Sequence, residues 1–252
     1  MTTLTIPELL ERIEYPESDG LPMSDNTEQW NWMILIKEGL EALFINEPNV
    51  FVAGNLLWYP VEGDNRLRVA PDVMVAFGPP KGPRGSYQQW REGGIAPQVV
   101  FEVVSPGNTQ AEILEKIDLY EEYGVEEFYI YDPDRKTLRG FRRQNDEWIA
   151  IPNMIGWISP RLNVEFGLQD GKLQLRGPDG RRFVSYVELV AQRQRSEAIA
   201  QREHNRAEQQ TQRAEQQTQR AEQQTQRAEQ AQQRAERLAD KLRAMGIDPD
   251  SV

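Results

Sequence analysis

Two carboxylates in the sequence have neighbours that make their positions chemically informative. Asp72 follows Pro71 at the start of an apolar run, and Glu102 lies within Val99–Val104, whose other members are Val and Phe. A carboxylate buried alone in such a run is costly unless it is paired with a cation or binds a metal ion. Carboxylate oxygens are the ligands that hard divalent cations prefer. We therefore take Asp72 and Glu102 as candidate metal ligands, expected on neighbouring strands.

A lysine further along the chain adds to this pair. Lys116 lies in the predicted helix 111–123, and at about 100° per residue it falls inside the apolar arc of that helix. An ammonium group that points inward needs a carboxylate, a phosphate or a water network to keep its charge. Beside two metal-binding carboxylates, Lys116 would orient a water that attacks phosphorus and offset charge in the transition state.

The same residues also have structural explanations. Asp72 is compatible with binding backbone amides at a strand start, and Glu102 with a structural ion pair to Lys116. Glu112 is explained mainly by the capping box that Thr109 opens, and its spacing also allows an i,i+4 contact with Lys116.

Four further residues are weaker candidates. Glu38, on the predicted helix 26–44, is a possible additional carboxylate, although a surface position explains it better. Ser105 and Asn108 would contact substrate or order their loop, whose turn-forming residues explain them equally well. Tyr120 would either contribute to the functional site or pack in the hydrophobic core.

Residue types that are scarce or absent exclude several chemistries. The sequence has no cysteine, and its single histidine, His204, lies in the polar C-terminal segment. The core therefore has no thiolate metal site, cysteine nucleophile or histidine-based triad. Catalysis there must rely on carboxylates, lysine, hydroxyl groups or a metal held by oxygen ligands.

The negative charge is concentrated in the first part of the chain. Residues 187–252 contain 11 Lys and Arg and 11 Asp and Glu, so the remaining 18 basic and 29 acidic residues place the net −11 on residues 1–186. An acidic surface is a poor general binder of phosphate backbones. This argues against a protein that coats nucleic acid, whereas a cation-binding site is itself acidic.

The elements that must position these residues alternate between helix and strand. The helices are expected at 26–44 and 111–123, and the strands at 50–61, 67–77, 98–104, 127–131, 138–143, 147–151 and 162–168. This order predicts an α/β fold with a mixed β-sheet flanked by helices.

The C-terminal segment repeats a seven-residue unit. Ala207–Arg213 recurs from Ala214 and again from Ala221, and most of its residues favour a helix. With alanine at position a, glutamine occupies most of position d, which is a poor coiled-coil seam. A solvated single helix and a weak coiled coil both stay open. The expected divisions are 1–186 for the folded domain, 187–245 for the helical tail and 246–252 for a flexible C-terminus.

The motifs together resemble a bacterial restriction-endonuclease family of the P-D-(D/E)-x-K nuclease superfamily, over about residues 20–170. The resemblance rests on Pro71-Asp72, Phe101–Pro106, Glu115-Lys116, Tyr120, Tyr123–Val125 and Tyr129–Pro133. It implies a restriction-endonuclease-like fold, with Asp72 and Glu102 holding Mg²⁺ or Mn²⁺ and DNA as substrate. The lysine that usually follows the glutamate by two residues is Val104 here, and Lys116 matches the family's alternative position.

Two classes of function follow from these observations. The first is a metal-dependent endonuclease; the second is an inactive nuclease-fold module that binds or assembles through its tail. A glycosidase would also use paired carboxylates, but no sugar-binding aromatics accompany them. We find no signal peptide and no apolar run of about 20 residues, which predicts a cytoplasmic protein without a membrane span. A homodimer through the core or the tail is compatible with the sequence.

Overall fold

The computed structural model describes residues 13–20, 22–145 and 147–246. The chain divides into two units, Met1–Ser185 and Tyr186–Val252, and each is described by itself.

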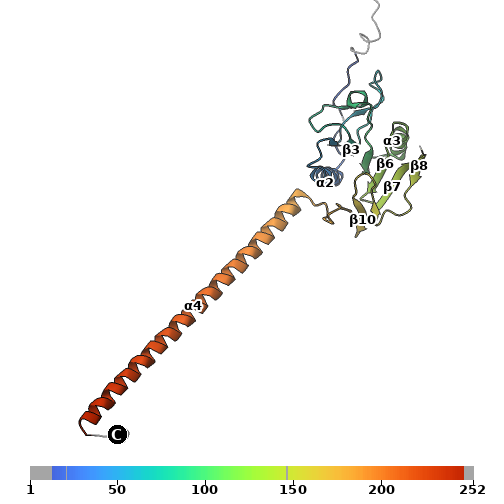
Figure 1. Cartoon of the computed structure of the whole chain (residues 1–252). Helices are drawn as coiled ribbons and strands as arrows, with labels where there is room; N and C mark the ends of the chain where they lie inside the picture. Colours follow the sequence, from blue (N-terminus) through green and yellow to red (C-terminus); the bar gives the residue numbers. More distant parts are fainter. Residues whose placement is uncertain (1–12, 21, 146, 247–252) are drawn as a thin grey trace, which may run out of the picture. The chain divides into compact units, whose positions relative to one another are not determined.

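A mixed sheet of six strands forms the centre of the first unit, in the order β1-β3-β5-β6-β7-β8 (Figure 1). The strands are β1 (Val50–Gly54), β3 (Val73–Phe77), β5 (Val99–Val103), β6 (Glu127–Asp132), β7 (Thr137–Gln144) and β8 (Glu147–Ala150). In this sheet β5 and β6 run parallel, and the other neighbours run antiparallel. Helix α3 (Gln110–Glu122) makes the crossover that a parallel pair requires.

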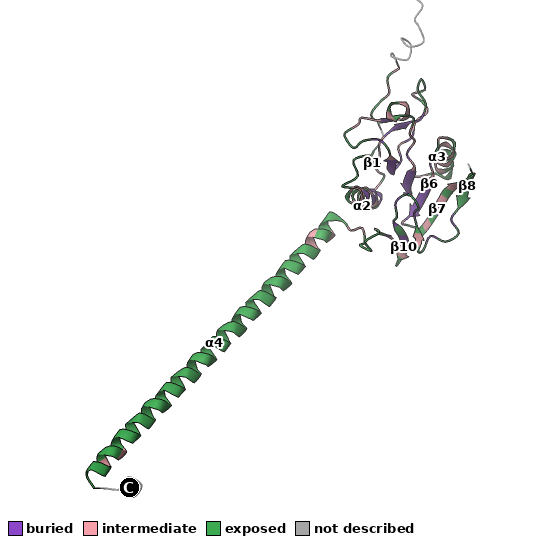
Figure 2. Ribbon diagram, in the orientation of Figure 1, coloured by how far each residue is buried: buried purple, intermediate pink, exposed green. Residues whose placement is uncertain are grey.

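Helices cover both faces of the sheet. Helix α2 (Thr27–Leu43) buries Met33, Ile36 and Leu40 against one face, while α3 buries Tyr120 against the other. Figure 2 shows buried residues concentrated in the strands between these helices. The expected α/β fold, a mixed sheet with flanking helices and a long C-terminal helix, is confirmed.

Strand β5 is buried on both faces, which explains its nearly continuous apolar sequence. Phe101 and Val103 belong to the cluster on the α2 side, whereas Val100 belongs to the cluster on the α3 side. Because side chains alternate along a strand, Glu102 points with Val100 toward α3.

Local signals explain where the helices begin and end. The Asn26 side chain accepts a hydrogen bond from the Gln29 amide and caps α2, and the predicted capping box of α3 is present between Thr109 and Glu112. After α3, Gly124 adopts a φ of 97°, which a glycine accepts without strain.

Two small sheets complete the first unit. One is antiparallel and contains β9 (Trp157–Ile158), β10 (Glu165–Gln169) and β11 (Lys172–Arg176). In the other, β2 (Trp58–Tyr59) runs parallel to β4 (Tyr87–Gln88), which precedes the 3₁₀ helix η1 (Gln89–Glu92). The sequence did not predict β4, β9 or β11. Strands β4 and β9 have two residues each, too few for an alternating pattern, whereas β11 forms a hairpin with β10 across Asp170-Gly171, a local signal that was missed.

Three strand predictions were too long. The expected strand 50–61 is split into β1 and β2 at Asn55, which has a φ of 49° and leaves the extended conformation. In 67–77 only the part from Val73 is strand, although Val69 exchanges both backbone hydrogen bonds with Trp58. In 162–168 the strand begins only at Glu165.

The second unit contains α4 (Tyr186–Ala244), which has no buried residue along its 59 residues. The predicted helix is therefore confirmed, and the coiled coil stays a prediction. The threonines of the repeat donate hydrogen bonds to the carbonyl groups of the alanines four residues earlier. In the expected C-terminal segment, residues 247–252 lie outside the described residues. Within the described ranges no helix combines the length and apolar character needed to cross a bilayer.

Candidate functional site

The two candidate carboxylates lie at adjacent ends of two neighbouring antiparallel strands. Asp72 immediately precedes β3, whose first residue, Val73, pairs with Phe101 of β5, so Asp72 reaches the end of β5 beside Glu102. The backbone amide of Val103 donates to Oδ2 of Asp72 at 2.6 Å. Asp72 is 6% exposed and Glu102 is 9% exposed, so both charges are largely removed from water.

Helix α3 places two donors on Glu102. Lys116 Nζ donates to Oε2 at 2.7 Å, and the Tyr120 hydroxyl donates to Oε1 at 2.5 Å. The two donors are four residues apart, so they lie on the same side of α3 one turn apart. The inward orientation expected for Lys116 is confirmed, and Tyr120 serves both the core and this carboxylate.

The charges of the cluster perturb one another. Burial raises the pKa of Asp72 to about 7, and the carboxylate of Glu102 adds to the increase, while Lys116 and the Val103 amide offset it only in part. Burial alone would lower the pKa of Lys116, but the carboxylates of Glu102 and Asp72 outweigh it and raise this pKa. Lys116 is therefore an ammonium group at neutral pH.

Asp72 and Lys116 open onto a pocket of about 550 Å³. Glu102 lines a smaller pocket next to it, and Lys116 belongs to the walls of both. The large pocket has an acidic lining. Its carboxylates are those of Asp19, Asp25, Asp72, Glu112 and Glu115, and its cations are those of Arg68 and Lys116.

The donor set of this site fits a hard divalent cation. Asp72 and Glu102 supply carboxylate oxygens from adjacent strands, and their mutual repulsion contributes to the raised pKa of Asp72. A cation between them would remove that repulsion. Among the described residues no three His, Cys, Asp or Glu side chains converge as metal ligands. Magnesium ions commonly use one or two carboxylates and complete their shell with water and substrate phosphate.

Known proteins similar to the chain identify its family. A family model for Uma2, described as "Putative restriction endonuclease", matches residues 10–174. The chain belongs to the Uma2 family. Among the solved structures that match is one titled as a putative nuclease belonging to DUF820, from Anabaena variabilis ATCC 29413. It shares 17% identity with a TM-score of 0.42, over 63% of this chain and 89% of that chain. No curated protein matches the chain.

The lysine of this Uma2 chain reaches the site from a helix. Position 104, where the superfamily pattern places the lysine, is the half-buried Val104, which packs against the core on the α3 side. Lys116 instead reaches Glu102 from α3. The helix thus supplies the ammonium group that the strand lacks.

The loop after β5 is ordered by its own polar residues. Ser105 is buried, and its hydroxyl donates to Oδ2 of Asp25, while Oδ1 of Asn108 accepts from the Ser105 amide at 2.9 Å. Asn108 and Asp25 line the large pocket, and Ser105 does not. These contacts agree with the loop-ordering explanation of Ser105, and they leave Asn108 beside the pocket.

The two other candidate glutamates differ in position. Glu112 makes the capping box with Thr109 and also lines both pockets next to Lys116. The side chain of Glu38 is 63% exposed, pairs with Lys37 at 3.0 Å and lines neither pocket. The structure therefore does not bring Glu38 to this site.

Sequence reasoning missed the residue through which α2 reaches the site. Gln29 is buried, its Nε2 donates to the Val103 carbonyl at 3.0 Å, and its Oε1 accepts from the Asp25 amide at 2.8 Å. A signal was present, because Gln29 precedes Met33 and Ile36 by four and seven residues on the apolar face of the helix. A polar residue in an apolar stripe marks a buried hydrogen-bonding position.

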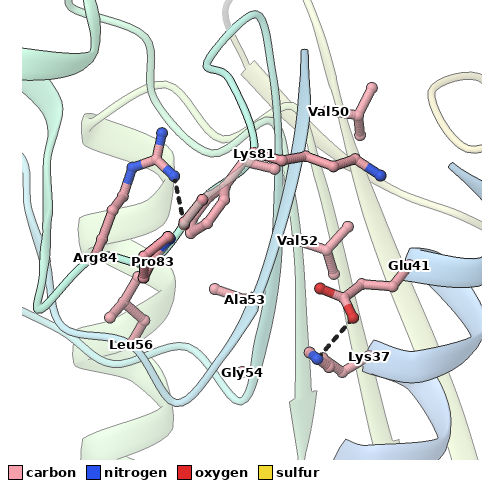
Figure 3. Close-up of a pocket in the computed structure, with 12 residues that line it drawn as sticks. Lys37, Glu41, Val50, Val52, Ala53, Gly54, Leu56, Lys81, Pro83 and Arg84 are labelled. Atoms are coloured by element: carbon pink, nitrogen blue, oxygen red, sulfur yellow. Dashed lines mark hydrogen bonds and ion pairs between the residues drawn. The ribbon is translucent and has the colours of Figure 1, made fainter. Parts of the chain in front are cut away.

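A second groove follows the outer edge of β1 (Figure 3). Its cations already have neighbours in the protein. Lys37 pairs with Glu41 at 2.8 Å, Arg84 pairs with Glu92 at 2.6 Å, and Lys81 donates to a backbone carbonyl at the end of α2. None of Asp72, Glu102 and Lys116 lines this groove, and we do not assign the site to it.

Proposed function

We propose that this protein is an endonuclease that hydrolyses DNA phosphodiester bonds with a divalent metal ion, Mg²⁺ or Mn²⁺. The observation that carries the proposal is the convergence of Asp72, Glu102 and Lys116 from three elements on one cluster. The chain's membership of the Uma2 family supports the same conclusion.

Asp72 and Glu102 would hold the metal ion through carboxylate oxygens. When bound, the ion would polarise the scissile phosphate and lower the pKa of a coordinated water. Asp72 must lose its proton first, because ligands bind metal in their deprotonated form. Glu102 is already oriented by Lys116 and Tyr120, so little side-chain freedom remains to be lost when it acts.

Lys116 would act by its charge. Its raised pKa keeps it protonated at neutral pH, so it cannot accept the proton of the attacking water. As water oxygen bonds to phosphorus and the bond to the leaving oxygen breaks, negative charge grows on the phosphoryl group. An ammonium group beside that charge stabilises the transition state. The water's proton passes to solvent, and the leaving oxygen takes one up from solvent.

One observation favours a second role, in assembly. Helix α4 has 59 residues and none is buried, although most helices in proteins depend on tertiary packing for their stability. A partner helix, from a second copy or from another protein, would supply such packing. An inactive nuclease-fold module that assembles through α4 is therefore the alternative.

A cleavage assay tests the proposal. Supercoiled plasmid is incubated with Mg²⁺ or Mn²⁺ and the wild type, Asp72→Ala or Lys116→Ala. The matched controls are Asp64→Ala and Lys136→Ala, which remove exposed side chains of the same types.

Metal-dependent nicking that is lost in the two site variants and kept in the two controls is the expected result. Nicking that survives Asp72→Ala would contradict the assigned metal site. A folded wild type without nicking would favour the assembly role.

A further inference from the structure

The large pocket poses an electrostatic problem for a nucleic-acid substrate. Five of its lining side chains are carboxylates and two are cations. DNA carries a dense negative charge and gains affinity by replacing its counterions with Lys and Arg. Lys116 already pairs with Glu102 at 2.7 Å, so its charge is largely balanced within the protein. The remaining cation of the pocket wall is Arg68.

Arg68 is held in place by the segment between β2 and β3. The next residue, Val69, donates to the Trp58 carbonyl at 3.1 Å and accepts from the Trp58 amide at 2.7 Å, which fixes the backbone. Nη1 of Arg68 donates to the Asn65 carbonyl at 3.2 Å, and the positive charge of the guanidinium acts on the nearby phenol of Tyr59. A side chain held this way loses little conformational entropy when it binds a ligand.

The chemistry of the guanidinium matches one class of ligand. Its five N–H donors lie in a planar fork, and the contact with Asn65 engages only one of its nitrogen atoms. Such a fork binds phosphate through two parallel hydrogen bonds, which an ammonium group cannot reproduce. Arg68 precedes Asp72 by four residues and lines the same pocket, so a phosphate on Arg68 would belong to a strand whose backbone also reaches the carboxylates.

We propose that Arg68 binds a phosphate of the nucleic-acid backbone and positions the strand across the pocket. The proposal rests on the proposed function in taking nucleic acid as the substrate. Arg68 is then a positioning residue: it fixes the register of the strand and leaves the reacting phosphorus to the carboxylates and Lys116.

Salt-dependent binding tests the role of Arg68. A fluorescent DNA duplex is titrated with the full chain in EDTA, which prevents cleavage, and the binding constant is measured by anisotropy over a range of salt concentrations. The variants are Arg68→Gln, Arg68→Lys and the control Arg66→Gln. Arg66 is exposed, lies two residues earlier in the same segment and does not line the pocket.

The expected result is specific to the pocket arginine. Arg68→Gln weakens binding by about tenfold, uniformly across DNA sequences, and reduces the slope of log K against log salt by about 1. Arg68→Lys keeps the slope but binds more weakly, because it keeps the charge and loses the fork. Arg66→Gln stays close to the wild type. Circular dichroism checks folding, and Arg68→Lys still tests the proposal if the glutamine variant does not fold.

Three results would overturn the proposal. The first is an equal slope of log K against log salt for Arg68→Gln and Arg66→Gln, and the second is wild-type DNA affinity in Arg68→Lys. The third is no measurable DNA binding by the wild type. The proposed function fails differently. If plasmid is not cleaved but the Arg68 variants lose binding as described, the nuclease assignment falls and the phosphate site stands. If plasmid is cleaved and Arg68→Gln behaves like the control, the phosphate site alone falls.

Discussion

The backbone amide of Val103 donates to Oδ2 of Asp72 at 2.6 Å, and this bond joins the residue that precedes β3 to the last residue of β5. It holds the Asp72 carboxylate next to Glu102 in a buried environment, where like charges repel strongly. Because the two carboxylates repel each other, a cation bound between them would be stabilising.

Metal binding should release a proton from Asp72. Its pKa is raised to about 7 by burial and by Glu102, whereas a metal ligand must be deprotonated. Below pH 7 the apparent Mg²⁺ affinity should rise by about tenfold per pH unit, and it should level off above pH 7. Isothermal titration calorimetry in buffers of different ionisation enthalpy measures the released proton. A pH-independent affinity with no proton release would contradict the prediction.

The raised pKa of Asp72 should also make the stability of the metal-free protein depend on pH. The folded protein binds this proton more tightly than the unfolded chain, where the ordinary pKa is 3.8. The resulting stabilisation is present below about pH 4 and is lost as pH rises through 7.

Asp72→Asn does not titrate and still offers an oxygen to the Val103 amide. In thermal unfolding without metal, the free energy of unfolding of the variant should therefore rise relative to that of the wild type between pH 5 and pH 8. The expected rise is on the order of 2 kcal/mol. If variant and wild type differ in unfolding free energy by the same amount at pH 5 and at pH 8, Asp72 does not titrate in this range.

Glu102→Ala should abolish metal binding and cleavage and leave the fold intact. The Lys116 side chain is 28% exposed, so its ammonium group can turn to water when its partner is removed. Glu38→Gln, which changes an exposed glutamate, is the matched control. Calorimetry with Mg²⁺ and the plasmid assay measure the effect, and circular dichroism checks the fold. Cleavage retained by the Glu102 variant would contradict the proposed metal-dependent mechanism.

Tyr120→Phe should destabilise the protein and slow cleavage. It removes the hydroxyl that donates to Oε1 of Glu102 at 2.5 Å, and hydrogen bonds to charged groups contribute about 1.5–3 kcal/mol. The freed carboxylate would also be less well oriented for a metal ion. Tyr123→Phe, at the C-cap of the same helix, is the control because Tyr123 is only partly buried. Equal thermal stabilities and cleavage rates of the two variants would argue against this role.

Removing α4 should leave the stability of the first unit unchanged. Because none of the residues of α4 is buried, a chain ending at Ser185 loses no buried side chain of that helix. We expect its Tm to differ from that of the full chain by less than about 2 °C, which corresponds to less than about 1 kcal/mol for a unit of this size. Differential scanning calorimetry measures the Tm, and analytical ultracentrifugation shows whether the tail drives association. A large loss of Tm would mean that α4 supports the first unit.

The sequence predicted the elements whose signals are local. The capping box at Thr109, the apolar face of α2 and the heptads of α4 each fix a helix through residues a few positions apart. The carboxylate within the apolar run of β5 identified Glu102 without any knowledge of its partners. The inward angle of Lys116 identified the second member of the pair in the same way.

Other features depend on contacts between residues that are distant in the sequence, and the sequence did not predict these features. Strand β4 exists because Tyr87 meets Trp58, and Gln29 joins the site only because α2 packs over the end of β5. Glu38 lies nine residues after Gln29 on the same helix, and its side chain is 63% exposed.

The sequence by itself thus determined the types of the chemical groups, the elements that carry them and the direction in which Lys116 points. Periodicity, capping and the cost of burying a lone charge are properties of short segments. Tertiary structure alone decided that Tyr120 shares Glu102 with Lys116, that the pKa of Asp72 lies near 7, and that Arg68 lines the same pocket. Electrostatic coupling depends on distances of a few ångströms between groups far apart in the chain, and only the folded sheet sets those distances.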